Sequence, residues 1–361
     1  MPEEPAILQP PPDPMLARQA PTARSQRSFA PQTPAIPDSD LARAQRLLDT
    51  VAGLFRTKVV GQESLLINLL VALLANGHIL LESVPGLAKT TGAQTLADAT
   101  KASFRRIQCT PDLLPSDIIG SQIFNYSKGT FETQLGPVHA NFVLLDEINR
   151  SSAKTQSAML EAMQERQTTI GGQLFKLPQP FIVLATQNPI EQEGTYELPE
   201  AQLDRFLLKE ILTYPKPTEE VEVLNRIEAG VFDTKMDASK SIDVPDVVYL
   251  QQLVKKVYVD ESIKKYIVGI INGTRWPAKV IAPDLARYVE NGASPRGSIT
   301  LMQVARALAL IKGRDYVTPD DVKQMRYSAL RHRIILNFEA VADNVHQEAV
   351  IDAIFAAVLA P

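Results

Sequence analysis

Three short apolar runs, each separated from the next by helical sequence, constrain the fold of this chain more than any other feature. They lie at residues 78–82, 141–145 and 181–185, and the segment 153–165 has apolar side chains at helical spacing. Uninterrupted apolar strands that alternate with helices are typical of a parallel sheet covered on both faces. We therefore predict an α/β fold whose ligand site lies at the carboxyl ends of these strands.

The character of the sequence changes after Pro215 and Pro217. Strand signals fade, and helical patterns follow at 219–229, 246–257, 261–274, 298–312 and 319–328. Before the first strand lie two more helical segments, 41–55 and 63–75. We predict an αβα core at residues 39–215 and a smaller, all-helical domain at residues 216–361.

Residues 1–38 form a Pro-rich arm with few large apolar side chains. Such a segment cannot bury enough surface to offset its ordering entropy, so we expect it to be disordered or extended. The arm lacks the basic and apolar regions of a signal peptide, and the most apolar stretch of the chain, 65–74, is too short to span a bilayer. We expect a cytoplasmic protein with no transmembrane segment.

The composition argues against two classes of protein. With 45% hydrophobic and 22% charged residues the chain is typical of globular proteins, and its one cysteine, Cys109, cannot form an internal disulfide. It is therefore not a small secreted domain stapled by disulfides, and we expect Cys109 to be buried. The formal net charge of −4 argues against a surface that coats nucleic acid.

The segment that follows the first strand and opens a helix has the position of a phosphate-binding loop. In such a loop backbone N–H groups bind phosphate oxygens, a lysine reaches the β- and γ-phosphates, and a hydroxyl ligates Mg²⁺. Lys89 and Thr90 suit the last two roles. The usual pattern has glycine where Ser83 and Ala88 stand, so a plain strand–turn–helix is the alternative. The predicted nucleotide-binding residues are Ser83, Val84, Pro85, Gly86, Leu87, Ala88, Lys89, Thr90 and Thr91.

Polar side chains follow the other two predicted strands. Asp146 and Glu147 end the second strand, where Asp146 would hold Mg²⁺ and Glu147 would orient and deprotonate the attacking water. Asn188 follows the third strand and could help to position that water. A helix cap and an ordinary Asn-Pro turn are the alternatives. The Lys-Thr loop upstream favours the catalytic interpretation.

Two arginines complete the candidate set. Arg205 lies in the segment Asp204-Arg205-Phe206, and Arg296 comes just before a helix of the second domain. An arginine can stabilise charge on a transferring phosphoryl group, and its planar fork suits phosphate. Taken alone, either arginine would be interpreted as a solvated surface charge.

These elements, in this order, resemble the AAA+ ATPases and, within them, the MoxR family. The likeness rests on the stretches 136–150, 163–167, 187–189 and 198–206, and it extends from about residue 41 to the end of the sequence. It implies an AAA+ P-loop αβα core with a parallel sheet, a helical lid domain, and ATP and Mg²⁺ as cofactors.

The resemblance also implies a role for each motif. Residues 83–90 look like Walker A, and Asp146 with Glu147 looks like Walker B. Asn188 looks like sensor 1. Arg205 resembles the arginine finger that reaches the ATP of a neighbouring subunit, and Arg296 resembles sensor 2. Hairpins at 121–137 and 168–175 would face the pore or a partner. The adenine would lie beside Val60 and Gly61.

For function, the resemblance implies a hexameric ring of identical subunits that couples Mg²⁺-dependent ATP hydrolysis to chaperone-like remodelling or maturation of partner complexes. Partners of such rings often carry a von Willebrand factor A domain. One alternative is a nucleotide-dependent scaffold that does not hydrolyse ATP, although a scaffold would need neither Glu147 nor Arg205. The other is a DNA-acting motor or a metal-chelatase subunit, and the acidic net charge disfavours binding to DNA.

Overall fold

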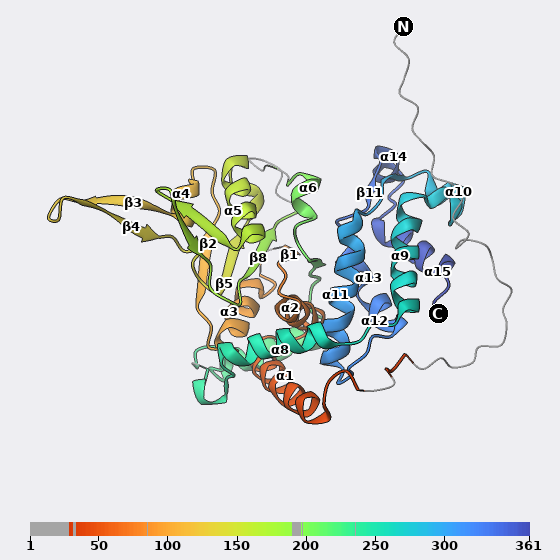
Figure 1. The fold of residues 1–361 in the computed structure, drawn as a ribbon, viewed down its shortest axis with the longest axis horizontal. Helices are drawn as coiled ribbons and strands as arrows, with labels where there is room; N and C mark the ends of the chain where they lie inside the picture. Colours follow the sequence, from red (N-terminus) through yellow and green to blue (C-terminus); the bar gives the residue numbers. More distant parts are fainter. Residues whose placement is uncertain (1–28, 32–33, 85, 190–195, 197, 235) are drawn as a thin grey trace, which may run out of the picture.

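The computed structural model describes residues 29–31, 34–84, 86–189, 196, 198–234 and 236–361. At its centre lies a five-stranded parallel sheet with the strand order β2-β5-β8-β1-β9 (Figure 1). The apolar runs of the sequence form three neighbouring strands in the middle of this sheet, which confirms the predicted α/β fold. The strands are β1 Ile79–Glu82, β2 Phe104–Gln108, β5 Phe142–Asp146, β8 Ile182–Gln187 and β9 Leu208–Ile211.

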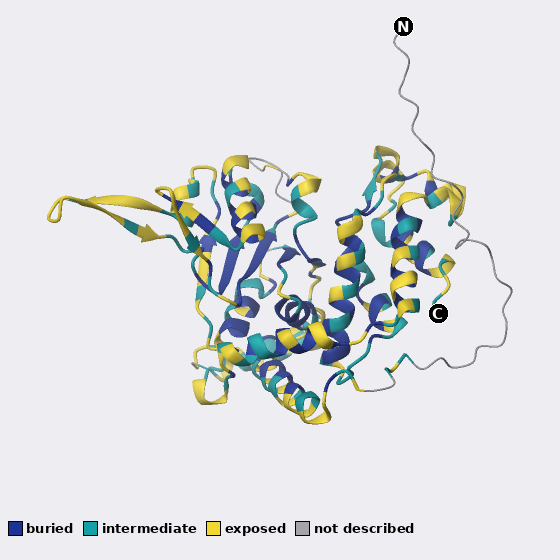
Figure 2. Cartoon of the chain, in the orientation of Figure 1, coloured by how far each residue is buried: buried dark blue, intermediate teal, exposed yellow. Residues whose placement is uncertain are grey.

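Successive residues of the central strands face two different cores. In β5, Phe142 and Leu144 belong to one apolar cluster, and Val143 and Leu145 belong to the other. Figure 2 shows these strands as buried, as a sheet covered on both faces requires. The first cluster includes residues of helices α1 Asp38–Lys58, α2 Glu63–Leu74 and α3 Lys89–Ala99, and the second includes residues of α4 Pro115–Ile119 and α5 Ala153–Glu165.

Two antiparallel hairpins interrupt the core. Strands β3 Gly120–Asn125 and β4 Thr130–Leu135 form an arm that extends away from the sheet (Figure 1), and β6 Gln167–Ile170 pairs with β7 Gln173–Lys176. At the turn of the second hairpin Gly171 and Gly172 have φ of 56° and 82°, a conformation that glycine adopts without strain. Both hairpins lie where the sequence predicts them.

Beyond the sheet the described chain is mostly helical. The predicted helix at 319–328 is in fact two short helices that meet at Met325, and a two-stranded sheet joins the helices of the lid. The elements are α6 Glu200–Leu203, α7 Pro217–Glu228, α8 Val244–Lys256, α9 Glu261–Arg275, α10 Pro283–Ala286, β10 Val289–Asn291, α11 Pro295–Ile311, α12 Pro319–Gln324, α13 Arg326–Leu330, β11 Ile335–Leu336, α14 Phe338–Ala342 and α15 Gln347–Ala357, with 3₁₀ turns at Ile148–Arg150, Ala238–Lys240 and Pro277–Lys279.

Helices from both ends of the chain contact each other. The Gln251 side chain of α8 donates to the Leu73 carbonyl of α2 at 2.7 Å, and Gln45 of α1 donates to the Leu310 carbonyl of α11 at 2.7 Å. Most of the Pro-rich arm, residues 1–28 and 32–33, lies outside the described residues. At its described end, the Ala35 N–H donates to Asp315 and Ile36 is buried. None of the helices described is long and apolar enough to cross a membrane.

Candidate active site

A cavity of about 560 Å³ opens at the carboxyl ends of the central strands. Lys89 and Thr90 line it from the first turn of α3, Asp146 and Glu147 from the end of β5, and Asn188 from the end of β8. Because the strands are parallel and adjacent, their polar ends meet at one edge of the sheet. The structure thus brings these five predicted residues together around one space.

The loop between β1 and α3 turns through two left-handed residues. Gly86 has φ of 87° and Ala88 has φ of 56°. The left-handed conformation is less favourable in free energy for alanine than for glycine. Ala88 is the N-cap of α3 and has no side-chain acceptor, so the helix N–H groups that face the cavity are suited to an anion. Ser83 is buried, and its hydroxyl donates to the Val84 carbonyl at 2.9 Å. Ser83 therefore stabilises the loop conformation and does not line the cavity.

Some of the other loop residues line the cavity, and one packs against the core. Leu87, Ala88 and Thr91 line the cavity together with Gly86, whereas Val84 packs against the apolar core. The prediction for Pro85 concerns a residue outside those that the structure describes.

The Lys89 ammonium is the cation of this loop. It donates to the Ser83 carbonyl at 3.3 Å. Burial lowers the pKa of Lys89, and the nearby carboxylates of Asp146 and Glu147 oppose that shift. A partly desolvated ammonium with one long hydrogen bond is well placed to exchange it for contacts with phosphate oxygens.

Asp146 is held by two neighbours that the sequence analysis did not identify. Its Oδ2 accepts from Arg106 of β2 at 2.5 Å, and its Oδ1 accepts from the Thr186 hydroxyl of β8 at 2.7 Å. Asp146 itself is 8% exposed. A buried carboxylate needs such partners, and together they fix its orientation toward the cavity.

Glu147 stands in a left-handed conformation, with φ of 57°, immediately after the strand. Its N–H donates to the Thr186 hydroxyl at 2.9 Å, so one threonine orients both acidic residues. Its Oε2 accepts from Gln108 at 3.1 Å and lies 3.2 Å from Nε of Arg150. A non-glycine residue held at positive φ marks a site where the surroundings over-determine the backbone.

Apolar side chains also line the cavity. Val59, Val60, Val223 and Phe232 line it from the α1–α2 connection, from α7 and from the chain that follows α7. Gly61, predicted beside the adenine, does not line this cavity. Its φ is 70°, and a Cβ there would lie 2.5 Å from Glu219 Oε2, so Gly61 serves the turn next to the cavity.

Four residues that line this cavity were not predicted from the sequence. Val223 and Phe232 lie more than a hundred residues from the phosphate loop, and no motif marks them. Arg106 and Gln108 belong to an edge strand. Because this strand carries charged side chains, its sequence resembles a polar loop and was not predicted as a strand. The two-residue spacing of Arg106 and Gln108, both facing the same side of a strand, is the one signal that could have found them.

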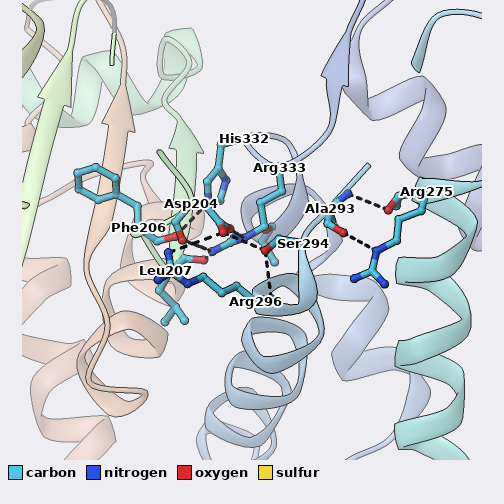
Figure 3. Close-up of polar contacts among 11 residues, drawn as sticks. Asp204, Phe206, Leu207, Arg275, Ala293, Ser294, Arg296, His332 and Arg333 are labelled. Carbon is cyan, nitrogen blue, oxygen red and sulfur yellow. Dashed lines mark hydrogen bonds and ion pairs between the residues drawn. The ribbon is translucent and has the colours of Figure 1, made fainter. Parts of the chain in front are cut away.

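Arg205 and Arg296 lie elsewhere. Both line a second cavity of about 270 Å³ that shares no lining residue with the first and lies between core and lid residues. Arg296 Nη1 is 3.9 Å from Asp204 Oδ2 (Figure 3). The structure thus brings these two arginines to one place, away from the Lys89 cavity of the same chain.

ATP and Mg²⁺ fit the donor set of the first cavity. The lining offers an ammonium, a hydroxyl, an amide and two carboxylates for the phosphates and the ion, and apolar side chains for a base. Among the described residues no group of three or more His, Cys, Asp or Glu side chains could hold a metal ion. A Mg²⁺ ion bound by Thr90 and Asp146 would therefore take its other ligands from water and phosphate, as this ion commonly does.

Cys109 has no part in this chemistry. It is 1% exposed, as expected, and burial raises the pKa of its thiol to about 12. At neutral pH it is a protonated, small apolar residue of the second core.

Comparison with known proteins agrees with this geometry. Residues 78–208 match the model of the ATPase family associated with various cellular activities (AAA), and residues 282–354 match the AAA lid domain. The chain is 47% identical over 303 residues to Chaperone MoxR1 of Mycobacterium tuberculosis, which covers 84% of this chain and 79% of that protein. It is 30% identical to Protein MoxR of Paracoccus denitrificans, covering 84% of this chain and 93% of that protein.

Among solved structures, a putative ATPase from Cytophaga hutchinsonii is similar in fold and sequence. Its TM-score is 0.83 at 45% sequence identity, and the match covers 90% of this chain and 98% of that one. The sheet order, the matched core and lid, and these identities lead to one conclusion: the chain belongs to the MoxR family of AAA ATPases.

Proposed function

We propose that this protein hydrolyses ATP with Mg²⁺ in the 560 Å³ cavity, and that an oligomeric ring of its subunits uses the energy to remodel or mature partner protein complexes. The observation that carries the proposal is the convergence of Lys89, Thr90, Asp146, Glu147 and Asn188 on that one cavity. Their chemistry matches the requirements of phosphoryl transfer, which are positioning and charge stabilisation.

The loop residues bind the nucleotide. The N–H groups at the start of α3 and the Lys89 ammonium offset the negative charge of the phosphates. Val60 and Phe232 contact the apolar face of the base. Bound Mg²⁺ supplies further positive charge, and Thr90 and Asp146 would hold it.

Glu147 acts as the general base, and Asn188 helps to place the water. The contacts with Gln108 and Arg150 both use Oε2 of Glu147, so Oε1 is the oxygen that can accept a proton without breaking them. Asn188 is 6% exposed at the end of the adjacent strand, where its amide faces the same cavity.

Arg205 and Arg296 act on the nucleotide of a neighbouring subunit. Neither lines the Lys89 cavity of its own chain, and both lie together at the second cavity. A site that needs an arginine from elsewhere is complete only in an oligomer, so turnover depends on assembly. The family expectation for this assembly is a hexamer.

The chaperone role is supported by the name of one relative, Chaperone MoxR1. The family resemblance supports a protein with a von Willebrand factor A domain as the kind of partner. We infer a cytoplasmic location, supported by the single cysteine, which cannot form an internal disulfide. Nucleic acid is not an expected ligand, because the chain is acidic overall.

Comparison of the wild-type protein with Glu147→Gln and Arg205→Ala tests the proposal. Both variants should lose ATP turnover in the presence of Mg²⁺, while Glu147→Gln should bind ATP as tightly as the wild type because its amide leaves the phosphate contacts intact. Equal turnover of wild type and Glu147→Gln would contradict catalysis at this cavity. It would favour the scaffold if ATP still drove assembly, and stimulation by DNA that fades with added salt would favour the motor.

A further inference from the structure

Arg333 is a buried cation that the proposed chemistry does not use. Its side chain is 2% exposed and follows α13 in the lid. Its Nε donates to Asp204 Oδ1 at 2.8 Å, Nη2 donates to the Phe206 carbonyl at 2.8 Å, and Nη1 donates to the Leu207 carbonyl at 3.2 Å (Figure 3). These acceptors come from one short loop of the core, and Arg205 lies in the middle of that loop.

The contacts require a guanidinium. Nη2 also donates to the Asp204 carbonyl at 3.3 Å, so the fork binds the backbone both before and after Arg205. Burial lowers the pKa of Arg333 to about 10, opposed by the charge of Asp204, and the side chain stays charged at neutral pH. An ammonium has three donors on a single atom and could not reach all of these acceptors.

A second link joins the same loop to α11. The Ser294 hydroxyl donates to Asp204 Oδ2 at 2.9 Å. Ser294 is also the N-cap of α11, where its oxygen accepts from the Arg296 N–H at 3.1 Å. Asp204 therefore contacts Arg333 through one carboxylate oxygen and the segment that carries Arg296 through the other.

We propose that Arg333 is a positioning residue for the arginine finger: it ties the core loop that carries Arg205 to the lid, and so fixes Arg205 and Arg296 relative to each other. This proposal rests on the proposed function, in which Arg205 acts on the ATP of a neighbour. Arg333 touches no nucleotide of its own subunit, because it lines the second cavity and not the first. Its effect must pass through Arg205.

Arg333→Lys is the direct test. It keeps a positive charge beside Asp204 and loses the fork, so the finger is displaced and kcat falls by about 10- to 100-fold. KM for ATP stays within about twofold of the wild-type value, because the variant's own cavity is intact. Arg314→Lys is the matched control. Arg314 is another lid arginine that binds a buried carboxylate, Asp321, at 2.6 Å, far in sequence from the finger loop. It should lower thermal stability and leave kcat unchanged.

Mixed assemblies separate this proposal from the proposed function. Arg333→Lys subunits have an intact cavity and a displaced finger, whereas Glu147→Gln subunits have the reverse. An equal mixture should hydrolyse ATP several-fold faster than the sum of the two alone, as should a mixture of Arg205→Ala with Glu147→Gln. Recovery with Arg205→Ala but not with Arg333→Lys would overturn the positioning role alone. Recovery with neither would overturn action across the interface, and with it both proposals.

Ser294→Ala is a second variant that tests the positioning of the Arg205 loop if Arg333→Lys does not fold. It removes the hydroxyl that ties Asp204 to α11 and that also caps α11 at the Arg296 N–H, and it leaves Arg333 itself unchanged. A lower kcat at unchanged KM, recovered in the mixture with Glu147→Gln, supports the proposal. A wild-type kcat for Ser294→Ala, or for a folded Arg333→Lys, overturns it.

Discussion

The buried His78 makes the stability of the core depend on pH. It lies at the start of β1, where its Nδ1 accepts from the Val183 N–H of β8 at 3.0 Å and its Nε2 donates to the Met163 carbonyl at the end of α5 at 3.2 Å. This pattern requires the neutral imidazole. Burial, helped by the charge of Arg166, lowers the pKa of His78 from the ordinary value of 6.5 to about 3.

The sign follows from which state binds the proton. Between the two pKa values the unfolded chain is protonated at His78 and the folded chain is not, so stability is full above pH 6.5 and is lost as the pH falls toward 3. Near pH 5 the loss from this one group is about 2 kcal/mol, because the unfolded state gains 1.36 kcal/mol for each pH unit well below its pKa. The result at this pH hardly depends on how far the folded pKa lies below it.

Urea unfolding of the wild type and His78→Gln near pH 8 and near pH 5 measures this contribution. Near pH 8 the variant should be less stable by about 1–3 kcal/mol, since it loses two buried hydrogen bonds. Near pH 5 the gap should shrink by about 2 kcal/mol. Asn141→Ala is the matched control: Asn141 is buried, donates to the Pro180 carbonyl at 2.9 Å and does not titrate, so its cost should be the same at both pH values. A gap for His78→Gln that is equal at both pH values would refute the reasoning.

Three further predictions concern the cavity. Lys89→Ala should abolish ATP binding by titration calorimetry, because it removes the ammonium that faces the phosphates, and undiminished binding would contradict the assigned loop. Phe232→Ala should weaken ATP binding by about tenfold and leave kcat unchanged, because it removes apolar contact with the base; a drop in kcat at equal affinity would place Phe232 elsewhere in the mechanism. Thr186→Val should raise the Mg²⁺ concentration needed for half-maximal turnover by about 10- to 100-fold, because the Thr186 hydroxyl orients Asp146, and an unchanged Mg²⁺ titration would exclude that role.

Local sequence patterns were sufficient to predict the strands whose side chains are uniformly apolar and the helices whose apolar residues are regularly spaced. Strands β1, β5 and β8 are buried on both faces, so their sequences are continuous apolar runs, and α5 begins and ends at the predicted residues, 153 and 165. Edge strands β2 and β9 carry charged residues because one side faces solvent or a polar site. A short sequence that mixes charged and apolar residues does not by itself predict a strand.

The site divides in the same way. Asp146 and Asn188 each follow directly on an apolar run, and Lys89 opens the helix after another, so sequence order alone predicts their meeting. Thr186 and Arg333 could not be found in this manner. Thr186 lies inside a strand, and Arg333 reaches a loop about 130 residues earlier in the chain, so their roles exist only in the folded arrangement.

The specific ATPase activity of the wild-type protein, measured with Mg²⁺ at protein concentrations that span assembly, tests the account most directly. Because Arg205 and Arg296 lie away from the Lys89 cavity of their own chain, activity per subunit should rise with concentration and level off as assembly completes, and Arg205→Ala should show no rise. Activity per subunit that is constant from monomer to assembled protein would contradict a catalytic site shared between subunits.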